Sequence, residues 1–317
     1  LQRRAPESLP ETVEASLQRL FVVRYGAANI TTFPPARDSQ AAKTHPWSGR
    51  IPPVTDTKMI VAWNSLMISG LARASVVFQK SEYFDLAAQA AQFILENQWQ
   101  GAPSERSTKG RFHRLNYNGN IAVIAQSEDY ALFIKALLDL DQASLHSSSD
   151  WLTHATQVQA EFDEFLWSIE LGGYYNTDAN ANLVIRERSF DDSATHAANG
   201  VAIANLVRLA LATEDLSYRD RAEQALRSFG QVMRESPQAC PSLFAALDWL
   251  RNPTLVRTQQ PTVELSQQYL PTVVQQLATE LPVGAVGLVC QGLSCQERAM
   301  SLEQMQEQIQ QSLVQSL

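Results

Sequence analysis

The chain has 317 residues, of which 45% are hydrophobic, and it carries a net charge of −8 at pH 7. This length supports one large domain or two smaller ones with a substantial hydrophobic core. The acidic balance and the scattered Lys and Arg residues argue against a nucleic-acid partner, and no apolar run approaches the roughly 20 residues that a membrane-spanning helix needs.

Three cysteines, Cys240, Cys290 and Cys295, are too few for a disulfide framework, so we expect a reducing, cytoplasmic setting. The first residue is Leu1 rather than a methionine. We therefore expect the sequence to be a processed product or a piece of a longer protein.

Amphipathic helices separated by polar breaks follow one another along most of the chain. Apolar residues recur every three or four positions, as on one face of an α-helix. Trp63, Leu66, Met67, Val77 and Phe78, for example, form one stripe of the kind found on an ordinary buried helix. The predicted helices span residues 11–24, 63–80, 82–99, 127–145, 150–168, 196–214, 217–235 and 241–250.

The connections between these helices alternate in length. Short ones lie near residues 81, 147 and 215, and long ones at 31–56, 100–126 and 169–195. Helices joined by short breaks pack as antiparallel neighbours. Such hairpins, stacked around a ring, put the short loops on one rim and the long loops on the other, where we expect functional residues.

Two of the long connections have the pattern of β-hairpins. In residues 111–125, Asn118-Gly119 is a strong two-residue turn signal between extended arms. In residues 172–189, an arm at Tyr174–Tyr175 and an arm at Leu183–Ile185 flank a polar turn.

The pattern changes after Trp249. Short strands are predicted at 254–258 and 283–290, with a helix at about 262–280 that Pro271 can break and a last helix from Ser301. We interpret residues 251–317 as a small α/β subdomain.

Five stretches of the sequence together resemble one protein family. They are TDTKMIVAWNSLMISGLARA, SEDYALFIKALLDL, GGYYNTDANANLVIRERS, AANGVAIANLVRLA and VGLVCQGLSC, and they occur in the family's order. The set is similar to the thioredoxin-domain proteins related to spermatogenesis-associated protein 20 and bacterial YyaL. The resemblance implies a mainly α fold, with an (α/α) barrel of the six-hairpin glycosidase type over residues 1–250 and the α/β appendage after it.

The chain departs from that family in several places. The family's thioredoxin-like domain, with its Cys-x-x-Cys motif, is absent, as are the opening helices of the barrel, so we expect the barrel to be incomplete at its N-terminus. Residues 54–58 differ from the family's His-x-Asp-Asp-Lys, and residues 196–200 differ from its Pro-Ser-Gly-Asn-Ser. We therefore discount His196 as a shared catalytic group.

The first group of candidate site residues, Asp56, Lys58, Trp63 and Asn64, stands at the entrance of helix 63–80. The resemblance places them on the rim of the barrel cavity, with Trp63 as a stacking surface and Asn64 as a partner for hydroxyl groups. Aromatic faces and amides suit sugars or other polyols. Alternatively, Asn64 caps the helix and Trp63 fills the core.

The second group, Glu128, Asp129 and Tyr130, lies in the first turn of helix 127–145. We expect Asp129 to face the cavity as an acid or base, with Glu128 and Tyr130 as substrate contacts. The alternative is that the acids lie there only because the helix dipole favours them.

The third group consists of Tyr174, Arg186, Asp192 and Asn199, around the entrance of helix 196–214. Asp192 is our candidate to pair with Asp129, since glycoside hydrolysis needs two carboxyl groups. The other three are expected to contact the substrate. Cys290 and Cys295 cannot complete a tetrahedral zinc site, so we expect a thiol pair there, no metal and no cofactor.

Two functions remain open from the sequence. One is a carbohydrate-binding or carbohydrate-modifying barrel, as in glycosidases and sugar epimerases. The other is a non-catalytic binding or interaction module of a thioredoxin-like redox protein. They differ in whether Asp129, Asp192 and Glu128 converge in an aromatic-lined pocket with Trp63 and Tyr174, or lie on the outside or in structural ion pairs.

Overall fold

The computed structural model describes residues 9–25, 43–44, 56–99, 111–145, 150–179, 183–292 and 294–314. The chain divides into two compact units, Leu1–Lys58 and Met59–Leu317. In the first unit, α1 (Leu9–Tyr25) is the long helix predicted at 11–24. Among the described residues, no helix is long and apolar enough to cross a membrane.

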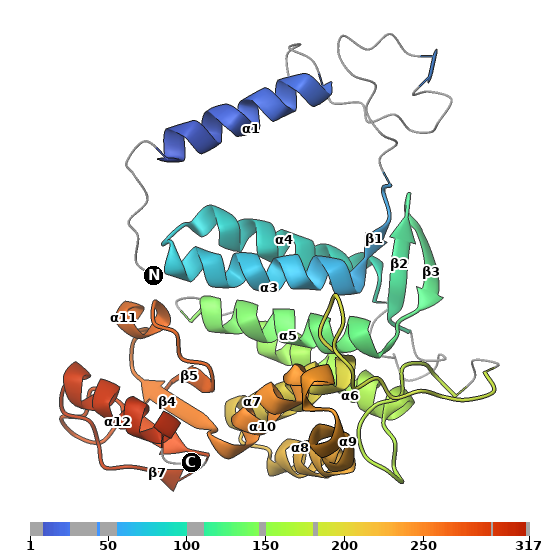
Figure 1. Cartoon of the computed structure of the whole chain (residues 1–317). Coiled ribbons are helices and arrows are strands. Elements are labelled where there is room, and N and C mark those ends of the chain that lie inside the picture. Colours follow the sequence, from blue (N-terminus) through green and yellow to red (C-terminus); the bar gives the residue numbers. More distant parts are fainter. Residues whose placement is uncertain are drawn as a thin grey trace. The chain divides into compact units, whose positions relative to one another are not determined.

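Helical hairpins build most of the second unit (Figure 1). Their helices are α3 (Val61–Val77) with α4 (Ser81–Asn97), α5 (Ser127–Ala143) with α6 (Trp151–Leu166), and α7 (Ala198–Thr213) with α8 (Leu216–Ser228), followed by α9 (Gly230–Glu235), η1 (Pro237–Ala239) and α10 (Pro241–Arg251). Helix α3 packs on α5, α5 on α7, and α7 on α10, while α4, α6 and α8 each pack on the hairpin partner. The fold class expected from the sequence is thereby confirmed: mainly α, an (α/α) array of the six-hairpin glycosidase type.

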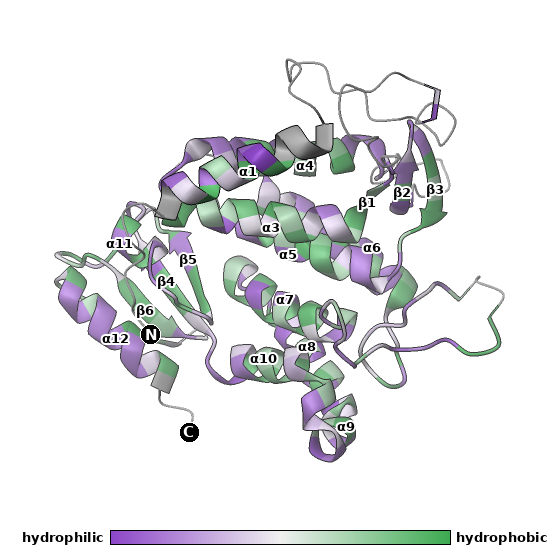
Figure 2. Ribbon diagram, turned by 45° about the horizontal axis from the view of Figure 1, so that its top comes forward, coloured by the Kyte–Doolittle hydropathy of each residue, from purple (hydrophilic) through white to green (hydrophobic). Residues whose placement is uncertain are grey.

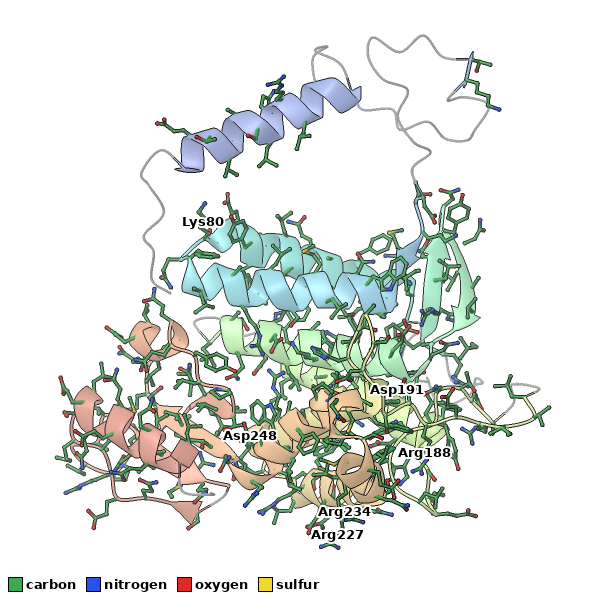
Figure 3. All side chains as sticks on the ribbon, viewed as in Figure 1. Lys80, Arg188, Asp191, Arg227, Arg234 and Asp248 are labelled. Carbon is green, nitrogen blue, oxygen red and sulfur yellow. A yellow bond between two sulfur atoms is a disulfide. The ribbon has the colours of Figure 1, made fainter. Side chains whose placement is uncertain are left out.

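The hydrophobic core follows the inner helices of this array. Helix α5 is buried over almost its whole length because α3, α6 and α7 surround it, and α7 is buried to a similar extent. Side chains fill the space between these helices (Figure 3). The helix predicted at 217–235 is two helices in the structure, which separate at Phe229.

Helix α3 buries a different face from the one that its sequence suggests. Its buried residues are small or β-branched: Val61, Ala62, Ser65, Ile68, Ser69, Ala72 and Ser75. The stripe of Trp63, Leu66, Met67, Val77 and Phe78 is exposed instead, with Trp63 63% and Phe78 65% accessible. Small side chains allow α5 to approach α3 closely, so the larger residues are left on the opposite face.

A three-stranded sheet of β1 (Met59–Ile60), β2 (His113–Tyr117) and β3 (Asn120–Ile124) stands beside the start of α3. The predicted turn at Asn118-Gly119 is confirmed, and both residues have the positive φ angles, 53° and 82°, that a tight hairpin turn of this kind needs. The second predicted hairpin, at 172–189, is wrong within its described residues. One backbone bond joins the two arms, from the Asn176 N–H to the Glu187 carbonyl (2.8 Å), and the side chains of Asn176 and Arg186 bond to Ser189 and to the Thr177 carbonyl.

The C-terminal part has a four-stranded sheet in the order β5-β4-β6-β7, with β5 parallel to β4 and the other pairs antiparallel. The strands are β4 (Thr254–Thr258), β5 (Val273–Leu277), β6 (Leu288–Gln291) and β7 (Ser294–Cys295), and the helices are α11 (Val263–Ser266) and α12 (Leu302–Val314). Helix α12 alternates hydrophilic and hydrophobic residues (Figure 2) and packs Met305 and Ile309 against Val256 and Val289.

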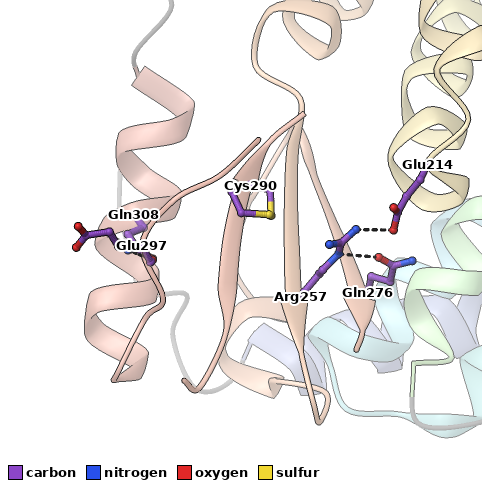
Figure 4. Close-up of a disulfide and its surroundings, with 7 residues drawn as sticks. Glu214, Arg257, Gln276, Cys290, Glu297 and Gln308 are labelled. Carbon is purple, nitrogen blue, oxygen red and sulfur yellow. Dashed lines mark hydrogen bonds and ion pairs between the residues drawn. A yellow bond between two sulfur atoms is a disulfide. The ribbon is translucent and has the colours of Figure 1, made fainter. Parts of the chain in front are cut away.

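Two sequence predictions for this part are wrong. The helix predicted at 262–280 ends at Ser266, before Pro271 where a break was expected, but the part predicted after Pro271 is wrong because Val273–Leu277 forms a strand beside β4. Cys290 and Cys295, predicted as a thiol pair, form a disulfide between β6 and β7 (Figure 4). The expected α/β appendage is present, and Arg257 of β4 joins it to the helical array through Glu214 (Figure 4). The boundary at residue 250 stays a prediction, as does the cytoplasmic setting.

Candidate functional site

Asp129 lies at the start of α5 and holds two helix entrances together. One carboxylate oxygen accepts a hydrogen bond from the Ala62 backbone N–H (3.1 Å), and the other accepts bonds from the Gln126 N–H (3.0 Å) and the Arg114 guanidinium (2.9 Å). The side chain is completely buried. Burial raises the pKa of Asp129 to about 6, although Arg114 and the backbone bonds oppose this. The carboxylate therefore caps α3 and α5 and presents no free surface.

Glu128, the neighbouring acid, is one-third exposed and forms an ion pair with Arg114. Arg114 thus holds both acids from strand β2, whose position the hairpin at Asn118-Gly119 fixes. The free edge of Glu128 is the part of this group that a ligand can reach.

Trp63 is the most accessible of the candidate site residues in the second unit. Its ring is 63% exposed, while the Asn64 side chain turns back to donate to the Ile60 carbonyl (2.9 Å). Asp56 and Lys58 belong to the first unit and form an exposed ion pair with each other (3.2 Å). Of this group, then, Trp63 is the side chain left open.

Asp192 organises the entrances of α7 and α10. It accepts bonds from the Ala197 N–H (2.6 Å), the Ser242 N–H (2.6 Å) and the Ser242 hydroxyl (2.7 Å). A Cβ at Gly200 would meet the Ser242 side chain at 2.1 Å, so the two helices approach each other closely here. Both Asp192 and Asp129 thus accept several internal hydrogen bonds that hold helix ends together.

Tyr130, Tyr174 and Asn199 lie in the interior rather than on a cavity. Tyr130 donates to Glu161 (2.6 Å), and Tyr174 donates to Asp163 (2.6 Å) while its ring stacks on Phe162. Asn199 exchanges hydrogen bonds with the Tyr174 backbone and donates to the Ser189 carbonyl; it thereby fixes the loop before α7. These three side chains are occupied by internal partners.

Arg186 lies on that same loop, with its guanidinium over the Tyr175 ring (3.9 Å) and bonded to the Thr177 carbonyl (2.9 Å). The adjacent residues Arg188 and Asp191 are labelled in Figure 3, and Asp191 is exposed. The structure therefore places Arg186 among loop contacts and brings it to neither Asp129 nor Trp63 through any hydrogen bond or ion pair of the described residues.

A charged cluster that the sequence interpretation missed lies further along the inner helices. Asp139 of α5 accepts from Arg73 of α3 (3.1 Å), Lys135 of α5 (2.7 Å) and Arg208 of α7 (2.8 Å), and the Ser69 hydroxyl also bonds to it. Burial alone raises the pKa of Asp139, but Arg208, Lys135 and Arg73 outweigh it and hold that pKa well below its usual range. Burial lowers the pKa of Lys135, and the two arginines add to this effect.

The sequence does contain one signal for this cluster: charged residues at apolar positions of three predicted helices. Arg73, Lys135, Asp139 and Arg208 all fall within three of the stretches that resemble the family, each on a helix whose neighbouring positions are apolar. Charged residues in such places are rarely fully buried unless they are paired. Sequence alone could not show that the charges of three helices meet at one carboxylate.

The cluster opens on a cavity of about 410 Å³ between the helical array and the residues around β5. Ligand pockets in proteins commonly have volumes of this size. Its lining includes Arg73, Asp139, Gln142, Arg208, Trp249, Tyr269 and Gln275. Among the residues that the structure describes, no three His, Cys, Asp or Glu side chains gather as metal ligands.

Comparisons with known proteins place the chain in a family. No family model matches it. Human spermatogenesis-associated protein 20 is 31% identical over 250 residues, which cover 73% of this chain and 31% of the human protein. The rat protein of the same name is 33% identical over 202 residues, which cover 61% of this chain and 25% of that protein. The chain thus spans a quarter to a third of the length of these relatives.

Solved structures with a related helical arrangement are more distant. A sugar epimerase from a ruminal bacterium has 17% identity and a TM-score of 0.47, covering 64% of this chain and 56% of its own. The α-mannanase BT2949 of Bacteroides thetaiotaomicron has 15% identity and a TM-score of 0.42, covering 56% and 46%. Activities do not transfer at such distances. The extent and identity of the sequence matches, in contrast, are decisive for the family: the chain belongs to the family of spermatogenesis-associated protein 20.

Proposed function

We propose that the second unit is a binding module for a carbohydrate or another polyol, with Trp63 as its stacking surface. The observation that carries this proposal is the exposure of Trp63, 63%, between the buried residues Ala62 and Ser65 of the same helix turn. Aromatic faces stack on the apolar faces of sugar rings.

Binding is favoured over hydrolysis. Hydrolysis of a glycosidic bond needs two carboxyl groups that face one substrate. Asp129 is buried and Asp192 is half-buried, and each accepts three hydrogen bonds that join helix ends. Glu128 is then the accessible carboxylate of the nominated set in the second unit.

The test is a titration of the full chain with neutral oligosaccharides, cellobiose and mannotriose, followed by calorimetry and thermal unfolding. We expect binding that Trp63→Ala weakens by about tenfold. Phe78→Ala is the matched control, because Phe78 is equally exposed, 65%, at the other end of α3. The proposal fails if neither sugar binds at millimolar concentration, or if Trp63→Ala binds as tightly as the parent chain.

A second candidate function is a protein-interaction module, favoured by the exposed apolar face of α3. Trp63, Leu66, Met67, Val77 and Phe78 form a continuous stripe of this helix. Surfaces of this kind mark partner-binding sites, and the resemblance suggests a thioredoxin-like domain as the partner. Mixing the chain with that domain from a relative should give a complex that Met67→Glu and Phe78→Ala both weaken. A Phe78→Ala chain that still binds as tightly would contradict this candidate.

A further inference from the structure

The cavity beside Asp139 lies away from Trp63, at the other end of the same helices. Trp63 is the third residue of α3 and Arg73 is the thirteenth, so they are separated by roughly 15 Å along the helix axis. Lining residues come from the C-terminal halves of α3, α5 and α7, from α10, and from the segment 265–275 (elements labelled in Figure 1).

Positive charge exceeds negative charge around this cavity. Arg73, Lys135 and Arg208 share the single carboxylate of Asp139. Asp141, six residues after Lys135 on α5, interacts with Arg208 but does not line the cavity. Of the described side chains that line the cavity, Arg73 and Arg208 are cations and Asp139 is the acid, so two positive charges meet one negative charge there. The nearby C-terminal ends of α3, α5 and α7 favour cations in these positions, but they provide no discrete anion to pair with each one.

The cavity wall also carries groups suited to an organic ligand. Trp249 lies beside the guanidinium of Arg208 (5.8 Å from ring centre), and Tyr269 is 87% exposed. The side-chain oxygen of Gln275 is buried and, among the described residues, meets no donor, although its backbone N–H bonds to Gln142 (2.8 Å). Gln275 lines the cavity, and rotation of its side chain would bring this acceptor to a ligand hydroxyl.

We propose that this cavity binds a small hydroxylated anion, a sugar or polyol that carries a phosphate or carboxylate group. The anionic group bonds to the guanidinium groups of Arg73 and Arg208, which suit both anions. A hydroxyl group donates to Gln275, and the carbon skeleton lies against Trp249 and Tyr269. The volume of about 410 Å³ accommodates a ligand of this size.

Calorimetric titration of the full chain at low salt tests the proposal with four probes: glucose 6-phosphate, glucuronate, glucose and inorganic phosphate. The two sugar acids distinguish a phosphate from a carboxylate group, and glucose tests the need for charge. We expect at least one of the two sugar acids to bind at least tenfold more tightly than glucose and than inorganic phosphate. The proposal is overturned if neither sugar acid binds, or if glucose or inorganic phosphate alone binds as tightly.

Variants then locate the site. Arg73→Gln should weaken binding of the sugar acid at least tenfold, because a charged hydrogen bond is lost. Arg73 is 60% exposed, and two other cations remain on Asp139 when it is replaced, so we expect this variant to fold. Arg208 is 7% exposed, and Arg208→Gln is therefore the less suitable variant because it can disrupt folding. Arg227→Gln is the matched control, since Arg227 is an exposed arginine of α8 paired with one acid (Figure 3).

The outcomes separate this proposal from the proposed function. Trp63→Ala should leave binding of the sugar acid unchanged, and Arg73→Gln should leave binding of neutral oligosaccharides unchanged. Equal binding by Arg73→Gln and Arg227→Gln would overturn the cavity assignment. Loss of sugar-acid binding in Gln275→Leu, by a few-fold, would support the role of its side-chain oxygen.

Discussion

Two buried aspartates on one helix show how differently the two ends of the inner helices are built. Asp129, in the first turn of α5, has one arginine and two backbone N–H groups as partners. Asp139, one turn before the end of α5, has three cations and a hydroxyl group. Burial raises the pKa of Asp129 to about 6 against the opposing effect of Arg114, whereas the cations lower the pKa of Asp139.

The difference follows from charge balance. At the start of α5, the helix dipole already favours an acid, and Arg114 is shared between Asp129 and Glu128. Near its end the dipole opposes an acid, so Asp139 depends on its cations, which together carry more charge than it neutralises. The charges around Asp129 are balanced, so this group joins two helix ends without a further ligand. The cations around Asp139 exceed its negative charge, so this group, which lies beside a cavity, can still bind an anion.

The largest effect should come from Asp139→Asn. The substitution leaves three cations around a neutral amide, and Arg208, 7% exposed, cannot turn to water. We expect a loss of about 3–5 kcal/mol in the free energy of unfolding, measured with urea at neutral pH. Asp163→Asn is the matched control: Asp163 is also largely buried, but its cation, Arg221, is 41% exposed and can rehydrate. Equal losses would show that the number of cations does not matter.

The pH dependence of stability should differ in sign between the two aspartates. The folded pKa of Asp129, about 6, lies above its unfolded value of about 3.9, so its contribution is fully present below pH 4 and is lost as the pH rises through 6. A difference of about two pKa units corresponds to about 3 kcal/mol. Asp139, with its lowered pKa, contributes above pH 4 and loses its contribution as the pH falls further.

Urea unfolding of the parent chain and of Asp129→Asn at intervals from pH 4 to pH 7 isolates the contribution of Asp129. The free-energy difference between the two chains should change by about 2 kcal/mol across this range, in the direction that disfavours the parent chain as the pH rises. Other acids titrate in both chains and cancel. A difference that stays constant with pH would contradict the raised pKa.

The sequence predicts the helical frame well because periodic apolar residues and short breaks are local signals. It fails where the choice between two faces depends on a neighbour. On α3 the stripe through Trp63 and Met67 is the more apolar face, yet the face through Ser65, Ser69 and Ala72 is buried, since only small side chains fit against α5. For the same reason the segment after Pro271, predicted as helix, is a strand, because β4 offers a partner that no local pattern reveals.

The candidate site follows the same rule. The acids Asp129 and Asp192 were identifiable as helix-entrance residues, but sequence could not show that several N–H groups converge on each carboxylate. The cluster around Asp139 joins side chains that are 66 to 69 residues apart along the chain. Such long-range pairs are set by the packing of three helices, which residue composition and local sequence patterns do not reveal.

Ser69→Ala sharpens the comparison with a smaller change. The Ser69 hydroxyl donates to Asp139 and accepts from Lys135, so its removal takes two hydrogen bonds from the cluster while the ion pairs remain. We expect a loss of about 1–2 kcal/mol in unfolding free energy. Ser75→Ala is the control: among the described residues the hydroxyl of this buried serine of α3 bonds to the Ala72 carbonyl and to no charged group, so we expect a loss of a few tenths of a kcal/mol at most. Equal losses would mean that the cluster does not depend on Ser69.

The smallest effect on stability should come from Arg73→Gln, although its effect on binding is the largest expected in the cavity. Arg73 is 60% exposed, and its pairing with Asp139 is therefore screened by water, so we expect a loss of about 1 kcal/mol or less by urea unfolding. Asp139 keeps Lys135 and Arg208, which are enough to hold its charge. A loss as large as that of Asp139→Asn would mean that Arg73 is part of the structural pairing, and the cation left over for a ligand would then have to be Lys135 or Arg208. A small loss of unfolding free energy together with weaker binding of a sugar acid would show that the fold does not require the charge of Arg73, whereas ligand binding in the cavity does.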